Sequence, residues 1–169
     1  IKNIFSRYKT FKNNVQKTSK ILYFILDLAE TLIIAFAIAM FIKTYICQVS
    51  VVPTGSMIPT LIGGVSGKQN DRLFVNKFIY SLSSPKAGDI VVFKSPHNDG
   101  KDYVKRCVGL PGETLEVKRG EIYINGKELI LAGVDIQNDY DFYGPIKIDE
   151  NAYFMMGDNR HNSGDSRAW

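Results

Sequence analysis

The chain has 169 residues, of which 45% are hydrophobic and 22% are charged, so its composition excludes a disordered chain and allows one domain with an appendage. Its formal net charge of +4 is unevenly distributed, because residues 1–20 contain six basic and no acidic side chains. The remainder, with 15 basic and 17 acidic side chains, is slightly acidic.

The first predicted element is a basic arm over residues 1–20, whose cations are Lys2, Arg7, Lys9, Lys12, Lys17 and Lys20. A basic arm can bind nucleic acid or the anionic face of a membrane. An apolar run follows this arm at once, which favours the membrane. The chain begins at Ile1 and stops abruptly at Trp169, so we expect it to be incomplete or processed.

The second predicted element is a transmembrane helix over residues 21–47. Its uncharged centre, Thr31–Ile42, is too short by itself, because a span needs about 20 residues. A span over residues 28–47 is long enough, with Asp27 at one edge and Lys43 near the other, where a lysine can extend to the interface. An amphipathic helix or a helix in a soluble core is the alternative.

The orientation of this span follows from the charges around it. The six cations precede the apolar run and few follow it closely, so the positive-inside rule predicts a cytoplasmic N-terminus with residues 48–169 outside the cytoplasm. A cleaved secretory signal is disfavoured, because no small-x-small cleavage site cleanly follows the run.

The third predicted element is an antiparallel β domain over residues 48–169. Two-residue turns, Arg119-Gly120 and the strong hairpin signal Asn125-Gly126, predict a three-stranded meander over residues 114–131. Residues 132–150 are rich in Asp, Asn, Gly and Tyr and are expected to form a long loop or insertion. Short apolar runs predict strands at residues 48–53, 72–75, 89–94, 102–108, 114–118, 121–124, 127–131 and 152–156.

Metal, nucleotide and disulfide sites find little support in the sequence. The run Gly63–Gln69 lacks the first glycine and the final Ser or Thr of a phosphate loop. His97 and His161 have no cysteine or carboxylate at zinc-ligand spacing. Two cysteines, Cys47 and Cys107, are too few for a disulfide scaffold, and we expect no bond between them.

Three segments combine residues that can carry chemistry. In residues 52–61, Ser56 follows a glycine between two prolines, in a turn that can present a hydroxyl together with a free amide. In residues 102–113, Lys105 shares a strand face with Tyr and Cys, which permits partial burial. Residues 157–167 are rich in short hydrogen-bonding side chains, with two arginines that can brace two aspartates. Taken separately, the three could be a plain turn, an exposed strand lysine and a solvated loop.

Together and in this order, the three segments resemble the bacterial type I signal peptidase family, and the likeness covers nearly the whole chain. The resemblance implies that Ser56 is the nucleophile and that Lys105 is the general base. It implies that the backbone N–H of Ser56 and the hydroxyl of Thr54 hold the oxyanion. Ser163 matches the serine that hydrogen-bonds the catalytic lysine in this family.

The resemblance also implies supporting and substrate-binding positions. His161 stands where an acid is common, which puts one bracing contact in doubt. The residues expected to brace the site are Asp158, Arg160, Asp165 and Arg167. Those expected to contact substrate are Val52, Met57, Asp102, Tyr103 and Val104.

The implied protein is a single-pass membrane serine endopeptidase that removes signal peptides after small residues one and three positions before the cut. Its expected partners are signal peptides and the lipid bilayer, without nucleic acid, metal or cofactor. The expected fold is mostly β, an antiparallel catalytic domain of coiled sheets or a partial barrel on one N-terminal helix, with residues 114–150 as an inserted lobe. The alternatives are another Ser/Lys protease, of the self-cleaving repressor or pilus-processing type, and an inactive anchored binding module.

Overall fold

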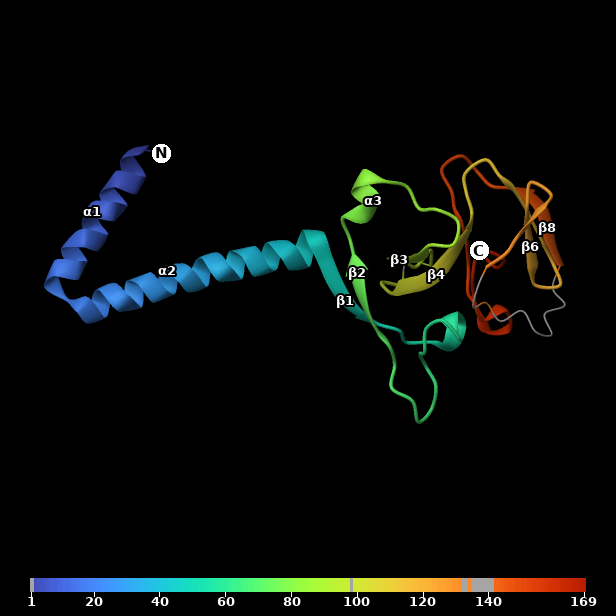
Figure 1. Cartoon of the computed structure of the whole chain (residues 1–169), viewed down its shortest axis with the longest axis horizontal. Coiled ribbons are helices and arrows are strands. Elements are labelled where there is room, and N and C mark those ends of the chain that lie inside the picture. Colours follow the sequence, from blue (N-terminus) through green and yellow to red (C-terminus); the bar gives the residue numbers. More distant parts are fainter. Residues whose placement is uncertain (1, 98, 132–133, 135–141) are drawn as a thin grey trace. The chain divides into compact units, whose positions relative to one another are not determined.

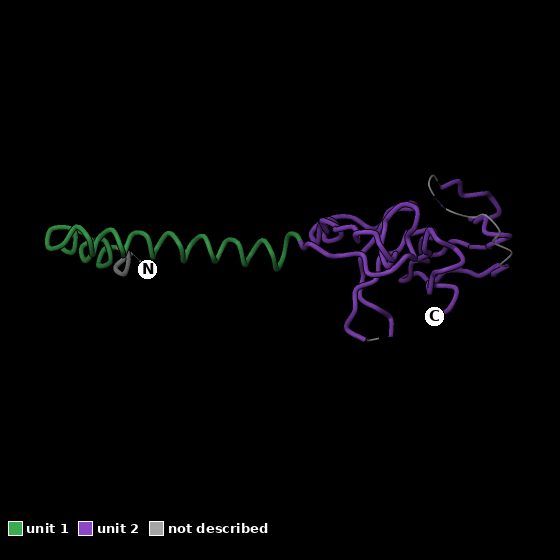
Figure 2. The backbone as a smooth tube through the Cα atoms, turned by 90° about the horizontal axis from the view of Figure 1, so that it is seen from below, with its two compact units in different colours: residues 1–47 green, residues 48–169 purple. Residues whose placement is uncertain are grey.

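The computed structural model describes residues 2–97, 99–131, 134 and 142–169. The chain forms two compact units, Ile1–Cys47 and Gln48–Trp169, which Figure 2 shows in separate colours. The first unit is helical and the second consists mainly of strands (Figure 1).

The helical unit contains two helices, α1 (Lys2–Thr18) and α2 (Lys20–Phe41), and α2 continues into a π-helical turn at Ile42–Ile46. Ser19 separates α1 from α2, and its hydroxyl accepts the N–H of Leu22, as expected of a residue that caps a helix. Lys20–Ile46 is the one segment of the described chain that is long and apolar enough to cross a membrane. The predicted N-terminal apolar helix is therefore confirmed, and the basic arm before it forms a helix of its own.

Two small sheets begin the second unit. Strands β1 (Cys47–Val51) and β2 (Arg72–Asn76) form a pair. Strands β3 (Ile90–Lys94), β4 (Asp102–Gly109) and β9 (Phe154–Met156) form an antiparallel sheet with β4 at its centre. A short helix, α3 (Ile79–Leu82), lies between β2 and β3 in the sequence. The central strand β4 is thereby fixed on both sides over part of its length.

A four-stranded antiparallel sheet completes the unit, in the order β7-β6-β5-β8. The predicted meander is confirmed, because both of its two-residue turns have successive positive φ values, 52° and 80° at Arg119-Gly120 and 52° and 78° at Asn125-Gly126. Its strands are β5 (Thr114–Lys118), β6 (Glu121–Ile124), β7 (Lys127–Leu129) and β8 (Phe142–Lys147).

Strand β8 corrects the prediction of a loop throughout residues 132–150, of which 132–133 and 135–141 lie outside the described residues. Gly144-Pro145 suggests a turn in the sequence, yet both residues lie within the strand. Proline is tolerated there because β8 is the last strand of its sheet and needs no second partner. The pairing register between β5 and β8 shifts between Leu115 and Val117, and this shift accommodates Gly144-Pro145.

One apolar core joins the four-stranded sheet to the central strands. The side chains of Leu115 and Val117 from β5 pack with Val108 of β4 and with Phe154 and Met156 of β9. The four-stranded sheet therefore shares its core with β4 and β9, and this packing supports β4 from one end.

Candidate active site

Ser56 lies in a single 3₁₀ turn, Gly55–Met57, shortly after β1, and its side chain is buried. The loop after β9 holds this turn, because the N–H of Asn159 donates to the Ser56 carbonyl (3.1 Å) and Asn159 Nδ2 donates to the Gly55 carbonyl (3.1 Å). On another side, a Cβ added at Gly63 would overlap the backbone oxygens of Val52 and Thr54. The glycine run that superficially resembles a phosphate loop thus permits close backbone packing beside Ser56.

Lys105 projects from β4 toward this turn, and Lys105 Nζ lies 2.8 Å from Ser56 Oγ. Only 4% of Lys105 is exposed. Burial lowers the pKa of Lys105, because desolvation disfavours the ammonium, and the charge of Asp165 opposes this shift without reversing it. The amine therefore has a larger neutral fraction than an exposed lysine and lies within proton-transfer distance of a hydroxyl.

Thr54 lies on the other side of the serine hydroxyl. Its Oγ1 donates to Ser56 Oγ at 3.3 Å. The hydroxyl of Thr54, which is two residues before Ser56 in the sequence, is thus directed at Ser56 Oγ, the atom from which a nucleophilic attack would begin.

Ser163 differs from what the resemblance implies. Its Oγ is buried and has no hydrogen-bond partner in the described chain, so the expected contact with Lys105 is absent. The Ser163 side chain packs against Gly157, where an added Cβ would overlap Ser163 Oγ and the Ser56 carbonyl oxygen. The hydroxyl lies near enough to Asp165 to help lower the pKa of that carboxyl, although it lacks hydrogen-bond geometry.

Asp165 and Arg167 form one of the two expected aspartate–arginine braces. Arg167 Nε lies 2.9 Å from Asp165 Oδ1 and Arg167 Nη2 lies 3.1 Å from Oδ2, while the Gly157 N–H donates to the same carboxylate. Burial alone would raise the pKa of Asp165, but these donors lower it below its ordinary value. Asp165 is therefore an anion, and it links Gly157 at the start of the loop after β9 to Arg167 at its end.

The second brace has a different partner from the one expected. Asp158 is fully buried and pairs with Arg106 of β4, whose Nε and Nη2 donate to its two oxygens at 2.7 and 2.6 Å. Thr60 adds a third donor at 2.6 Å. Arg160 instead donates to two backbone carbonyls, those of Gly157 and Gly120.

Strand alternation in the sequence placed Arg106 with Val104 on the face opposite Lys105, and Arg106 was assigned no role. The available signal was its charge on the face opposite Lys105, because consecutive strand residues point to opposite faces. Arg106 thus connects the strand that carries Lys105 to the loop that holds Ser56.

A cleft of about 610 Å³ opens onto Ser56 and Lys105. Met57 does not line it, in contrast to the sequence prediction, because the residue after Ser56 turns inward and its side chain is fully buried. The other predicted substrate contacts, Val52, Asp102, Tyr103 and Val104, all line this cleft.

Among the residues that the structure describes, one wall of the cleft is a strand edge without a pairing partner. Strand β4 pairs with β9 only from Arg106 onward, whereas its pairing with β3 extends back to Asp102. The hydrogen bonds of Lys101 and Cys107 go toward β3, so alternation directs the backbone groups of Asp102 and Val104 the other way. An extended peptide can therefore add to this edge.

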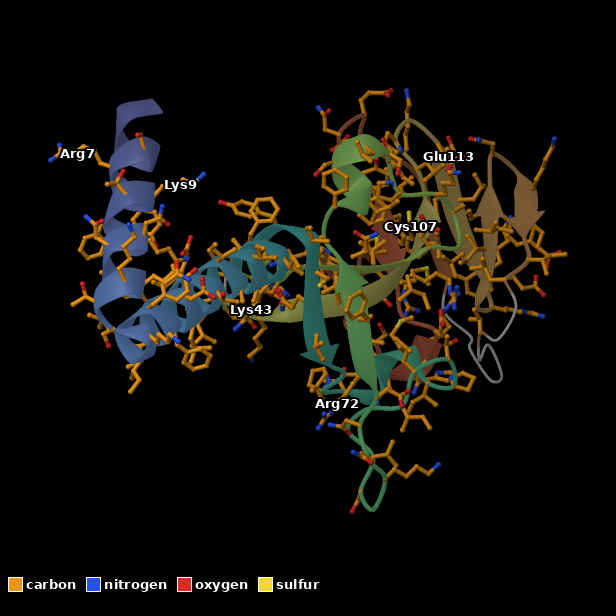
Figure 3. All side chains as sticks on the ribbon, turned by 60° about the vertical axis from the view of Figure 1, so that its left-hand side comes forward. Arg7, Lys9, Lys43, Arg72, Cys107 and Glu113 are labelled. Carbon is orange, nitrogen blue, oxygen red and sulfur yellow. The ribbon has the colours of Figure 1, made fainter. Side chains whose placement is uncertain are left out.

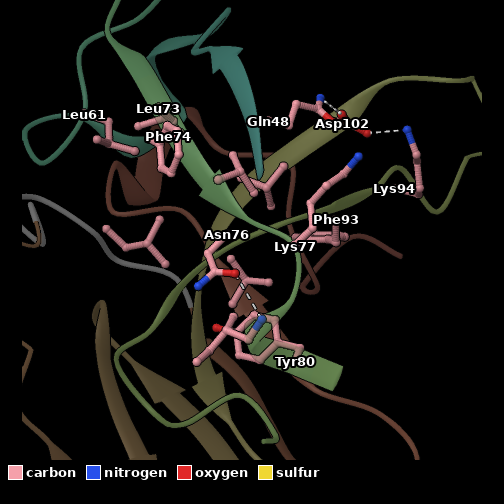
Figure 4. A pocket seen from close by; sticks show the side chains of 15 residues that line it. Gln48, Leu61, Leu73, Phe74, Asn76, Lys77, Tyr80, Phe93, Lys94 and Asp102 are labelled. Atoms are coloured by element: carbon pink, nitrogen blue, oxygen red, sulfur yellow. Dashed lines mark hydrogen bonds and ion pairs between the residues drawn. The ribbon is translucent and has the colours of Figure 1, made fainter. Parts of the chain in front are cut away.

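A second groove, of about 650 Å³, lies between β2 and β3 (Figure 4). It is lined mainly by apolar side chains such as Leu61, Phe74 and Ile79, and it includes neither Ser56 nor Lys105. Asp102 borders both spaces and pairs with Lys94 at 2.6 Å. The chemistry therefore belongs to the smaller cleft.

Metal-binding clusters are absent from the part of the chain that the structure describes, where no three His, Cys, Asp or Glu side chains could hold an ion. Both cysteines are free, as the sequence predicted. The chemical groups gathered at the cleft are thus a hydroxyl, a buried amine and the donors around them.

A family model and the sequences of known proteins match this chain to signal peptidases. The family model described as "Signal peptidase, peptidase S26" matches residues 25–169. A probable signal peptidase I-2 of Synechocystis sp. is 37% identical over 149 residues, which are 85% of this chain and 65% of that protein. A signal peptidase I of Bacillus amyloliquefaciens is 38% identical over 165 residues, 92% of this chain and 84% of that protein. The crystal structure of a signal peptidase I from Enterococcus faecalis V583 matches with 34% identity and a TM-score of 0.43, over 50% of this chain and 86% of that chain.

Proposed function

The chain belongs to the signal peptidase family, peptidase S26, and from this premise we propose that it is a membrane-bound serine endopeptidase that removes signal peptides from secreted preproteins. The observation that carries the proposal is the 2.8 Å contact between a buried amine, Lys105 Nζ, and the hydroxyl oxygen of Ser56. A serine hydroxyl is a weak nucleophile until an adjacent base removes its proton. A lysine whose pKa is lowered by burial can be that base.

In the proposed reaction, Ser56 Oγ attacks the scissile carbonyl carbon while its proton passes to the neutral amine of Lys105. The ammonium then gives this proton to the leaving nitrogen, which departs as the new N-terminus of the mature protein. The signal peptide remains as an ester on Ser56. Water, deprotonated by the same amine, hydrolyses the ester and restores the hydroxyl.

The negative charge that develops on the carbonyl oxygen needs preorganised donors. The proposed donors are the backbone N–H of Ser56 and the hydroxyl of Thr54, and the 3.3 Å contact of Thr54 Oγ1 with Ser56 Oγ supports this assignment. One such donor contributes typically about 3–4 kcal/mol to the stabilisation of the transition state.

Substrate selection follows from the unpaired edge of β4. A signal peptide that adds as a strand beside residues 102–105 points alternate side chains the same way, so the residues one and three positions before the cut share one wall. Val52 and Tyr103 line the cleft there and limit its depth. We therefore propose cleavage after small residues at both positions.

The proposed location is the cell membrane, with α2 as the single span, the N-terminus cytoplasmic and the strand-rich unit outside. The six cations before the apolar run support this orientation. Digestion of intact cells with an external protease tests it: the proposal expects loss of residues 48–169 and survival of residues 1–20, and the opposite pattern would reverse the topology.

Hydrolysis is tested with the full chain in detergent micelles and a preprotein carrying Ala-x-Ala before its cleavage site. The wild type should produce the mature N-terminus, identified by mass spectrometry, and Ser56→Ala and Lys105→Ala should each lose at least about a thousandfold in rate. The matched controls, Ser66→Ala and Lys68→Ala, alter exposed residues away from the cleft and should keep the activity. Cleavage by Ser56→Ala, or none by a folded wild type, would overturn the proposal, and the second result would favour an anchored binding module.

A further inference from the structure

The helical unit contains an arrangement that peptide hydrolysis does not use. Helix α1 folds back along the start of α2. Tyr8 contacts Glu30 and the later residue Lys12 contacts the earlier residue Asp27, so the two helices run in opposite directions. The two helices therefore form a hairpin around Ser19 whose arms splay apart away from this corner (Figure 1).

Lys12 is the centre of this hairpin. Its ammonium lies 2.7 Å from Asp27 Oδ1 and 2.7 Å from Glu30 Oε2, and it also lies over the ring of Tyr23 at 5.6 Å. The Tyr8 hydroxyl donates to Glu30 at 2.9 Å. Asp27 and Glu30 are the only acidic residues of the sequence before Cys47, and the ammonium of Lys12 pairs with both of their carboxylates.

Three further cations of α1 are directed elsewhere. Arg7, Lys9 and Lys17 are exposed, and Figure 3 shows Arg7 and Lys9 projecting from the helix. The apolar side of α1 is only partly covered by α2, since Tyr8 is 43% exposed and Phe11 is 55% exposed. Helix α1 thus carries exposed cations together with partly exposed aromatic side chains, as a helix at a membrane interface does.

The length of α2 places this helix at the membrane surface. Lys20–Ile46 contains 27 residues, or about 40 Å of helix, whereas the hydrocarbon layer is about 30 Å thick. The span predicted over residues 28–47 leaves this surplus on its N-terminal side, so Asp27 lies near the boundary of the hydrocarbon layer and Lys12 holds α1 at that level. Charge complementarity favours a phosphate-bearing lipid surface over nucleic acid, because the aromatic side chains and the span belong in lipid.

We propose that α1 is a membrane-surface helix that binds the head groups of anionic phospholipids, with Lys12 fixing its depth through Asp27 and Glu30. The proposal rests on the proposed span of α2 and is independent of the hydrolytic site. Incorporation of the protein into nanodiscs tests the span of α2 by itself. A failure of the span can therefore be distinguished from a failure of α1 to bind lipid head groups.

The test is amide hydrogen exchange of α1 in the full chain, in nanodiscs of phosphatidylcholine alone and of phosphatidylcholine with about 30 mol% phosphatidylglycerol. Anionic lipid should slow exchange across residues 7–18, on the order of a hundredfold for three cations at a charged surface, and added salt should reverse the effect. The triple variant Arg7→Gln/Lys9→Gln/Lys17→Gln should lose this protection. The matched triple Lys68→Gln/Lys86→Gln/Lys127→Gln, which neutralises exposed cations of the second unit, should keep it.

Two further outcomes decide against the proposal. Equal protection in both lipids would mean that contact with α2 alone protects α1 from exchange. Protection only by added RNA would mean that the exposed cations of α1 bind nucleic acid. Lys12→Gln tests the positioning role: α1 should lose protection in both lipids while Lys9→Gln keeps most of it, and unchanged exchange in Lys12→Gln would remove that role.

Discussion

Replacing Arg106 by methionine tests the connection between the lysine strand and the serine loop. The substitution keeps much of the apolar stem but leaves the Asp158 carboxylate, which is 0% exposed, without its two guanidinium donors. Removing one partner of a buried ion pair typically costs about 3–5 kcal/mol, because the remaining charge stays desolvated. The Thr60 hydroxyl remains as a donor, and a hydroxyl compensates only part of a lost cation.

The expected change in melting temperature follows from the size of the strand-rich unit. At about 2.1 cal/mol/K per residue over Gln48–Trp169, the unfolding entropy is roughly 0.26 kcal/mol/K. A loss of about 3–5 kcal/mol then lowers the melting temperature by roughly 12–20 °C. Near-ultraviolet circular dichroism of the detergent-solubilised chain follows this unit through Trp169, the one tryptophan of the sequence.

A double-mutant cycle separates the ion pair from general damage. Arg106→Met/Asp158→Leu removes both charges, so it should recover most of the stability that Arg106→Met loses. Arg72→Met, at an exposed position on β2, is the matched control and should change stability by less than about 0.5 kcal/mol. A loss below about 1 kcal/mol in Arg106→Met, or a double variant no more stable than the single one, would refute the reasoning.

Four other outcomes are expected at and around the cleft. Since burial lowers the pKa of Lys105, kcat/KM should rise with pH and level off below the ordinary lysine value of 10.5, and a rise centred at or above 10.5 contradicts a neutral base. The unfolded chain holds that proton more tightly, so stability should rise with pH between the lowered and the ordinary pKa in the wild type, and less in Lys105→Met. Thr54→Val should reduce kcat about 10²–10³-fold while Thr54→Ser stays close to wild type, and equal rates for Thr54→Val and wild type would remove its role. Gly157→Ala should destabilise the protein by about 1–3 kcal/mol and slow hydrolysis, whereas Gly164→Ala, with open space around its Cβ, should leave the melting temperature unchanged; two equal melting curves would contradict the packing argument.

Local features of the fold were predictable from the sequence alone. The apolar helix, the meander at residues 114–131 and most strands depend on neighbouring residues, whose polarity and turn propensity are read directly. Strand β8 was missed for the same reason, because Gly144-Pro145 has the local chemistry of a turn and only the pairing with β5 makes it a strand. Helix α1 was recognised as basic, but its hairpin with α2 depends on contacts that Lys12 makes 15 and 18 residues away.

At the candidate site, sequence pattern and family resemblance named the chemical groups, and the tertiary structure decided their partners. Ser56 and Lys105 are 49 residues apart, and the alternation of a strand tells which face a side chain takes without telling what lies opposite. The same limit hid the pairing of Arg106 with Asp158, the inward turn of Met57 and the orientation of Ser163 toward Gly157. Burial and pairing are properties of the assembled chain, because desolvation and hydrogen-bond geometry depend on atoms that the sequence separates and the fold brings together.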